Sequence, residues 1–256
     1  MKKFRTCILS MFFCMAMPHL QAQTKVIAHR GFWNTEGSAQ NSLTSLRKAA
    51  EARLYGSEFD VQMTADSIIV VNHDNAIGGY IIEKTPYSKI KSLKIKNGEY
   101  LPTLQSYLKE AQELDIRLIL EIKPHSTKTR DDVAVKKIVN MVRSMGLEKQ
   151  TEYISFSMNI CERLVEETQG QSEIFYLNGD MSPLSVKAKG LTGIDYHYKV
   201  FQKNPEWIKE AHDCGLKVNT WTVNQENTLK KMVSMNVDFI TTDNPLEATK
   251  IITENK

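Results

Sequence analysis

The sequence predicts an α/β protein folded as a single closed (β/α)8 TIM-type barrel. Short apolar runs rich in β-branched residues alternate with segments of helical period. Alternation of this kind is typical of parallel strands joined by helical crossovers. About eight such units fit in the 256 residues of the chain, which favours a closed barrel over an open doubly wound sheet.

Eight strands are expected, and each is a short apolar run. They lie at 25–28, 55–61, 116–122, 152–156, 173–177, 191–195, 216–221 and 237–241. The helices expected between them lie at 42–53, 103–114, 132–145, 158–168, 204–213, 225–235 and 244–252. After the fifth strand the pattern is less regular, and Ser182 with Pro183 can open a short helix there.

One apolar run, SIIVVN at 67–72, has no helix of its own. We expect it to pair with the second strand as a hairpin. Residues 74–101 then form a small excursion from the barrel, placed between the second strand and the helix expected at 103–114.

The first residues have the order of a secretory signal peptide. A basic start is followed by an apolar stretch and, at Ala22, by a small residue. We therefore predict a signal peptide at 1–22, a barrel domain at 23–256, and an exported protein that is periplasmic or secreted. The apolar stretch is too short to span a bilayer comfortably, which disfavours an uncleaved anchor.

The charge balance does not favour a nucleic-acid or membrane partner. The chain has 33 Lys and Arg against 30 Asp and Glu, and the predicted signal peptide holds three of the basic residues and none of the acidic ones. The remaining chain has 30 of each and is formally neutral, so nothing in it suggests nucleic acid or an anionic membrane as the main partner. We expect a small molecule as the partner, and removal of the signal peptide would leave no stable membrane anchor. Cys161 and Cys214 also remain, and we expect free thiols there rather than a disulfide.

Polar side chains follow several of the apolar runs at the point where the strands end. Barrel active sites are built at the C-terminal ends of the strands. The residues expected there are His29, Arg30, Asp60, Glu121, Lys123, Ser157, Asp195, Trp221 and Asp243. A single polar residue in such a place is usually a helix cap or a turn former, whereas a set at one end of a barrel indicates an active site.

Three carboxylates indicate a metal site. Glu58 and Asp60 are two residues apart on one strand, so both point to the same face. Glu121 ends an apolar run, where a carboxylate would otherwise face desolvation. Three acids in one barrel mouth repel one another unless a cation lies among them, and an all-oxygen set suits Mg²⁺ or Ca²⁺. Glu58 and Asp60 alone would indicate only a salt-bridged pair, so Glu121 decides for the metal.

Two histidines are candidates for acid/base chemistry. His29 and His73 each terminate a strand-like run, and histidine is the side chain best suited to proton transfer near neutral pH. Arg30 and Lys123 supply positive charge suited to phosphate oxygens. Together with a hard metal, this set is equipped to cleave a phosphate ester. The other histidines are expected to leave with the signal peptide (His19) or to lie in loops or on the surface (His125, His197 and His212).

The sequence resembles the glycerophosphodiester phosphodiesterase family. The motifs that carry the resemblance are AHRG (28–31), EFDVQMTAD (58–66), NHD (72–74), LPTL (101–104), EIK (121–123), WTVN (221–224) and VDFITTDNP (237–245). They fall in the family's order across essentially the whole chain after the predicted signal peptide. The resemblance implies a TIM-type barrel that hydrolyses glycerophosphodiesters to glycerol 3-phosphate and an alcohol.

The resemblance also implies roles for individual residues. Glu58, Asp60 and Glu121 match the family's metal ligands, and His29 and His73 match its general acid/base pair. Arg30 and Lys123 match its phosphate contacts. Trp221 matches an aromatic residue at the substrate mouth, although simple barrel packing also explains a tryptophan there.

One motif departs from the family. Its members usually carry Pro-Glu-Asn-Thr at the opening of the first helix, where this chain has Ala39-Gln40-Asn41-Ser42. The acid is replaced by an amide of the same shape, so we expect Gln40 to tune the charge of the site. We expect the helix to begin near Asn41, because asparagine is a good N-cap.

Three functions remain open from the sequence. The first is metal-dependent hydrolysis of glycerophosphodiesters by a pair of histidines. The second is a phospholipase-like lyase, in which a neighbouring hydroxyl attacks the phosphorus and a cyclic phosphate is released. The third is a non-catalytic binding protein of the same fold, which the presence of both histidines and all three acids disfavours.

Overall fold

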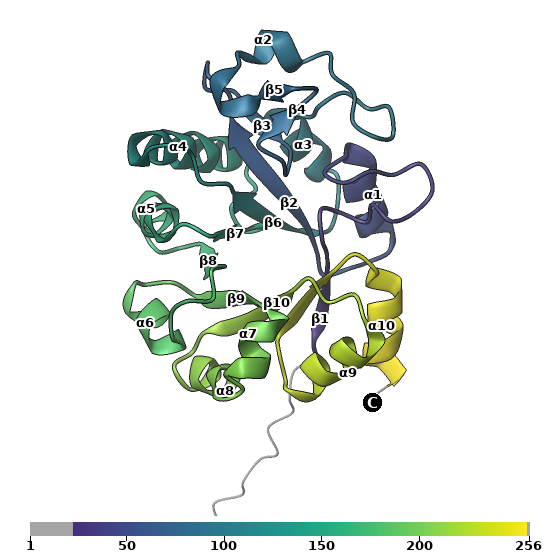
Figure 1. Ribbon diagram of the computed structural model, residues 1–256, viewed down its shortest axis with the longest axis vertical. Coiled ribbons are helices and arrows are strands. Elements are labelled where there is room, and N and C mark those ends of the chain that lie inside the picture. Colours follow the sequence, from purple (N-terminus) through teal and green to yellow (C-terminus); the bar gives the residue numbers. More distant parts are fainter. Residues whose placement is uncertain (1–22, 255–256) are drawn as a thin grey trace, which may run out of the picture.

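The computed structural model describes residues 23–254, so the predicted signal peptide at 1–22 lies outside the described residues. In the described part, eight parallel strands form a ring with helices around it (Figure 1). The strand order is β1-β11-β10-β9-β8-β7-β6-β2, and β1 also pairs with β2, which closes the ring. The predicted (β/α)8 barrel is confirmed.

The barrel strands coincide with the predicted runs to within a few residues. They are β1 (Lys25–Ala28), β2 (Gly56–Met63), β6 (Arg117–Ile122), β7 (Thr151–Ser155), β8 (Glu173–Tyr176), β9 (Gly193–His197), β10 (Lys217–Trp221) and β11 (Phe239–Thr242). The helices around them are α1 (Leu43–Glu51), α3 (Leu104–Ala111), α4 (Lys128–Ser144), α5 (Met158–Thr168), α6 (Pro183–Ala188), α7 (Tyr198–Lys203), α8 (Glu206–Asp213), α9 (Glu226–Ser234) and α10 (Pro245–Glu254). The sequence did not predict α7, because a helix of six residues is too short to show a period.

Helix starts depend on the residue that caps them. Ser182 caps α6 and Pro183 is its first residue, as predicted. In α1 the N-cap is Ser42, whose hydroxyl accepts a hydrogen bond from a backbone N–H one turn further on. The prediction of Asn41 as the cap is wrong. Asn41 has a φ of 60°, in the left-handed region, and its side chain bonds to Asp60 instead.

The extra apolar run forms the predicted hairpin partner. It is β3 (Ile69–Val71), which pairs antiparallel with β2. The excursion after it contains β4 (Ala76–Ile77), β5 (Tyr80–Ile81), the 3-10 turn η1 (Ile82–Lys84) and α2 (Tyr87–Ile90), drawn at the top of Figure 1. A small core of Val70, Ile82, Ile90 and Leu101 packs it onto the barrel. The excursion therefore has a small core of its own next to the strand ends.

Strand alternation places two kinds of residue on each barrel strand. In β6, Leu118 and Leu120 pack in the large core between strands and helices, whereas Ile119 packs in the smaller core inside the barrel. Glu121 points the same way as Ile119 and is one step nearer the C-terminal end. The inner apolar layer thus forms the floor, and the polar residues stand above it.

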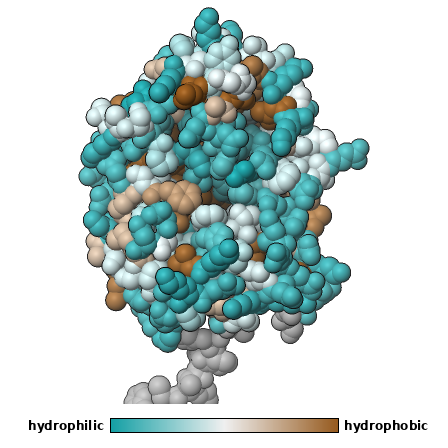
Figure 2. Space-filling view, viewed as in Figure 1, coloured by the Kyte–Doolittle hydropathy of each residue, from teal (hydrophilic) through white to brown (hydrophobic). Residues whose placement is uncertain are grey.

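In the described part of the chain, the face of the molecule drawn in Figure 2 has no broad apolar patch. That face is mostly hydrophilic, and its hydrophobic atoms form small separate groups, some of them near the top where the excursion lies. Among residues 23–254, no helix combines the length and the apolar character needed to cross a membrane.

The floor of the barrel leaves no room for a side chain at Gly193. A Cβ added there would lie 2.2 Å from the ring of Phe175, which is itself buried in the inner core. We predict that Gly193→Ala lowers the free energy of unfolding by about 1–3 kcal/mol, the usual effect of overpacking. Urea unfolding measures it. Phe175→Leu combined with Gly193→Ala should recover part of the loss, and strictly additive effects would contradict this origin.

Candidate active site

A pocket of about 110 Å³ opens at the C-terminal ends of the strands. Its lining residues are His29, Arg30, Glu58, His73, Glu121, Lys123, Ile154, Phe156, Leu177, Asp195, Trp221, Thr222 and Thr241. Of the residues that the sequence placed at the site, Asp60, Gln40, Ser157 and Asp243 are not in this lining. A larger cavity of about 840 Å³ lies at the other ends of β2 and β6, beside Tyr55 and Arg117. It holds none of the predicted residues.

Two of the predicted site residues, His29 and Arg30, follow β1 in a tight turn. His29 follows β1 directly, and its backbone N–H bonds to the carbonyl of Thr242 at the end of β11. Gly31 has a φ of 76°, and a Cβ there would lie 2.2 Å from the Ser45 hydroxyl in α1. Glycine is therefore required after Arg30, so that the chain can turn beneath the start of the helix.

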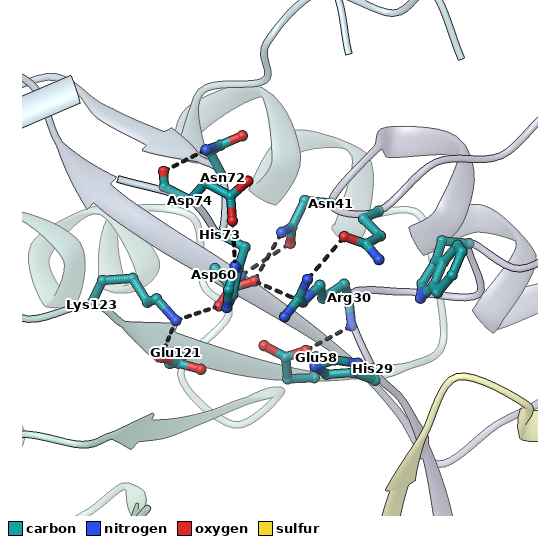
Figure 3. Close-up of polar contacts among 12 residues, drawn as sticks. His29, Arg30, Asn41, Glu58, Asp60, Asn72, His73, Asp74, Glu121 and Lys123 are labelled. Atoms are coloured by element: carbon teal, nitrogen blue, oxygen red, sulfur yellow. Dashed lines mark hydrogen bonds and ion pairs between the residues drawn. The ribbon is translucent and has the colours of Figure 1, made fainter. Parts of the chain in front are cut away.

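The three carboxylates are brought together by strand register. Asp60 on β2 stands opposite Glu121 on β6, and Glu58 lies two residues before Asp60. One oxygen from each lies within 4.8 Å of the others, and all three side chains are buried (Figure 3). Burial, followed by the charges of Asp60 and Glu121, raises the pKa of Glu58 well above its usual range. Burial and the charge of Asp60 raise the pKa of Glu121 to about 7.

Two basic side chains partly balance this charge. Lys123 Nζ lies 2.7 Å from Glu121 and 3.1 Å from Asp60. Arg30 Nε lies 3.8 Å from Asp60, and the Arg30 backbone N–H donates to Glu58 over 2.6 Å. Burial works to raise the pKa of Asp60, but the positive charge of Lys123 above all outweighs it and lowers that pKa. Burial works to lower the pKa of Lys123, and the two carboxylates beside it raise it instead.

The donor set fits a divalent cation. Burial, followed by the charges of the neighbouring carboxylates, raises the pKa values of two of the three carboxylates, and a cation bound among them would oppose both effects. Their oxygens are close enough to share one ion, and oxygen-only sets are what Mg²⁺ and Ca²⁺ prefer. Glu58, Asp60 and Glu121 are therefore the residues that could hold a metal.

Asn41, which the sequence predicted only as a helix cap, is a residue of the site. Its side-chain amide donates to an Asp60 oxygen over 2.9 Å, and its carbonyl accepts from the Asp60 backbone N–H over 3.1 Å. This two-point contact fixes Asp60. Gln40 turns the other way, and its carbonyl oxygen accepts from Arg30 Nη1 over 2.9 Å. The amide that replaces the family's acid therefore contacts Arg30, and the proposed tuning of the site by Gln40 stays a prediction.

A carboxylate holds His29. The Nδ1 of His29 lies 2.8 Å from Asp243, and Asp243 also accepts from Trp33 Nε1 over 2.9 Å and from Asn224 Nδ2 over 2.6 Å. Burial works to raise the pKa of Asp243, but the hydrogen bond and charge of His29, followed by the other donors, lower it. An ionised carboxylate only accepts, so Nδ1 of His29 carries the proton and Nε2 is left for chemistry. The sequence placed Asp243 at a strand end without giving it this role.

His73 has a similar partner but a more open setting. Its Nδ1 lies 2.8 Å from Asp74, whose side chain is largely exposed. Gln62 on β2 donates to the backbone carbonyls of Asn72, His73 and Asp74, which ties this segment to the barrel. Both candidate histidines therefore have Nδ1 next to a carboxylate.

An aromatic wall stands on the other side of the pocket. Trp221 meets the ring of Phe156 edge-on at 5.5 Å and that of His197 at 5.2 Å. Its Nε1 donates to the backbone carbonyl of Asp195 over 2.9 Å. Asp195 lies in the middle of β9 rather than at its end, and burial raises its pKa well above the usual range.

The structure also places the residues for which the sequence predicted no catalytic role. His197 ends β9 and contacts Trp221, so it belongs to the mouth of the barrel. His125 lies in a loop but is buried, where Nε2 accepts from the Met63 backbone N–H over 3.0 Å. Ser157 is a helix cap, for α5. The expected free thiols are present, with Cys161 buried and Cys214 partly exposed.

Fold and site together define a barrel enzyme equipped to act on phosphate esters. The model of the glycerophosphoryl diester phosphodiesterase family matches residues 29–247. The chain belongs to this family and is a phosphodiesterase, as the resemblance implied.

Individual relatives agree with this assignment. A crystal structure of a glycerophosphodiester phosphodiesterase from Parabacteroides distasonis is 50% identical, with a TM-score of 0.90 over 92% of this chain and 99% of that one. The glycerophosphodiester phosphodiesterase of Caldanaerobacter subterraneus is 27% identical over 87% of this chain and 95% of its own length. A putative glycerophosphoryl diester phosphodiesterase from Silicibacter pomeroyi, 23% identical, shares the fold with a TM-score of 0.81 over 93% and 95% of the two chains.

Proposed function

We propose that the protein hydrolyses glycerophosphodiesters to glycerol 3-phosphate and an alcohol, with a divalent cation held by Glu58, Asp60 and Glu121 and with His29 and His73 as the acid/base pair. The observation that carries the proposal is that three clustered carboxylates and two carboxylate-held imidazoles surround one small pocket. Family membership supports the reaction, and the geometry supports the division of labour.

Binding of the phosphate falls to the basic residues of the pocket. The guanidinium of Arg30 and the ammonium of Lys123 both line it and can donate to phosphate oxygens. Gln40 holds one nitrogen of Arg30, which fixes the direction of the guanidinium. A bound divalent cation would withdraw negative charge from the phosphate and compensate the three carboxylates.

Proton transfer falls to the histidines. With Nδ1 next to a carboxylate, Nε2 of each ring is the nitrogen that can take up or give a proton. One histidine accepts a proton from the attacking oxygen, and the other donates one to the oxygen of the leaving alcohol. The pocket of about 110 Å³ and its wall of Phe156, Leu177 and Trp221 suit a short carbon chain such as glycerol.

The reaction product decides between hydrolysis and the lyase alternative. We expect ³¹P NMR of the protein with glycerophosphocholine and Mg²⁺ or Ca²⁺ to show the monoester glycerol 3-phosphate. A cyclic diester would identify the lyase reaction, in which a hydroxyl of the substrate replaces water. Absence of turnover with either ion would leave only the non-catalytic binding protein.

Removal of the metal should abolish activity. We predict that EDTA stops turnover and that Mg²⁺ or Ca²⁺ restores it, because the three carboxylates repel one another without a cation. Glu121→Gln should weaken metal binding and so raise the concentration of Mg²⁺ or Ca²⁺ that gives half-maximal activity, measured by titrating activity against the ion. Glu113→Gln, at an exposed acid away from the pocket, is the control and should behave as wild type. Full activity after exhaustive chelation would sink the metal assignment.

Each histidine should be needed for the rate. We predict that His29→Ala and His73→Ala each lower kcat by at least about 10²-fold, the lower range for a lost general acid or base. Steady-state kinetics measure this, and circular dichroism checks the fold. The control is His212→Ala on α8, where the imidazole is paired with Asp238 outside the pocket. Near-normal turnover of either site variant would reduce that histidine to a structural residue.

Asp243 should act through His29 as a positioning residue. Asp243→Asn keeps the size of the side chain but offers an amide, which no longer fixes the proton on Nδ1. We predict a fall in kcat of roughly 10²-fold, comparable with loss of a general acid or base, with little change in KM and an altered pH profile. Asp238→Asn, beside His212, is the matched control. Equal effects on kcat and on stability in both variants would indicate a merely structural role.

A further inference from the structure

Two grooves adjoin the catalytic pocket on the side of the excursion. The first, of about 290 Å³, is lined by Ala39, Gln40, Asn41, Asn72, His73, Asp74, Ala76, Ile77, Gly78, Lys94, Ile95 and Lys96. The second, of about 340 Å³, shares Ala39, Gln40 and Lys96 with the first and continues to Trp33. Because His73 lines both the catalytic pocket and the first groove, the grooves begin at a residue that takes part in the proposed chemistry.

The grooves carry an excess of positive charge. Lys94 and Lys96 are exposed on the segment that returns from the excursion to the barrel. Within residues 23–254 neither side chain is paired with a carboxylate, and Lys94 only lies over the ring of Tyr100 at 5.6 Å. Both ammonium groups are therefore available to a ligand in the grooves.

The carboxylates near these lysines are already engaged. Asp74 lines the first groove, but one of its oxygens contacts His73. The oxygens of Glu99 accept from the backbone N–H groups of Leu43 and Thr44 at the start of α1. Gln40, in the wall that the two grooves share, is neutral. The linings of the two grooves thus hold two lysines against one carboxylate, Asp74, and this balance favours an anionic ligand.

The size of the catalytic pocket leaves one arm of a diester outside it. A volume of about 110 Å³ has room for the phosphate and a short chain against the aromatic wall. The second ester arm must leave the pocket, and the grooves that start at His73 offer it a path.

We propose that these grooves take the alcohol arm of the substrate and that Lys94 and Lys96 make the enzyme prefer an alcohol that carries an anionic group, such as a second phosphate. This inference rests on the proposed function and specifies its substrate class. Exposed ion pairs are individually weak and are screened by salt. The preference should therefore be moderate and should shrink as the ionic strength rises.

The test compares two substrates that differ by one group. Glycerophosphoglycerol has a neutral alcohol arm, and the same diester phosphorylated on its distal hydroxyl has an anionic one. Loss of the diester ³¹P signal gives kcat/KM for each, at a fixed excess of divalent ion. In wild type at low salt, we expect the anionic substrate to be favoured about five- to tenfold, the effect of two exposed ion pairs.

Variants locate the origin of the preference. Lys94→Gln with Lys96→Gln should bring the ratio of the two kcat/KM values close to one. Lys91→Gln makes the same charge change on an exposed lysine of the excursion that lines neither groove, and the ratio should stay at its wild-type value. High salt should lower the wild-type ratio.

The outcomes separate this inference from the proposed function. Turnover of both substrates without a preference, or a preference that survives in the double variant, would overturn the inference and leave the function intact. An equal loss in the Lys91→Gln protein would also overturn it, because the effect would then come from overall charge. If neither diester is turned over, the proposed function fails and the inference fails with it.

Discussion

The mutual repulsion of three buried carboxylates is the constraint on which the rest of the site depends. Glu58, Asp60 and Glu121 come from two neighbouring strands, and the barrel hydrogen bonds prevent them from moving apart. Charges that cannot separate must be compensated where they stand. Lys123 supplies part of that compensation. Burial first, and then the charges of the neighbouring carboxylates, raise the pKa values of Glu58 and Glu121. A closed barrel is suited to this task because it holds like charges at a fixed separation.

The two candidate histidines are held by different parts of the structure. His29 follows a barrel strand, and its partner Asp243 is held in turn by Trp33 and Asn224. His73 comes from the segment that leads into the excursion, and its partner Asp74 is exposed. One imidazole is therefore fixed by the barrel itself, whereas the other shares a wall with the grooves that would receive the alcohol. The excursion thus connects the proposed chemistry with the proposed choice of substrate.

Much of this arrangement was predictable from the sequence because it follows from strand periodicity. The alternation of apolar runs and helical segments predicted the barrel, and the spacing of Glu58 and Asp60 put both on one face. What could not be predicted depends on backbone conformation or on distant partners. Asparagine is a residue type that often caps helices, but the backbone of Asn41 has a positive φ, and its side chain bonds to Asp60 instead. His125 does lie in a loop, but its burial was not predictable, because nothing in its own segment shows that it bonds to the backbone of Met63.

Gln40 joins the two halves of the site. Its carbonyl oxygen holds Arg30, the proposed phosphate contact, and its side chain also lines both grooves that lead away from His73. A carboxylate in this place would pair with Arg30 and would also add a negative charge to the two grooves that Lys96 lines. The neutral amide keeps the hydrogen bond to Arg30 without that charge. The departure of this chain from the family's usual acid is therefore consistent with a site that still orients its arginine while it leaves the lysines of the groove free for an anion.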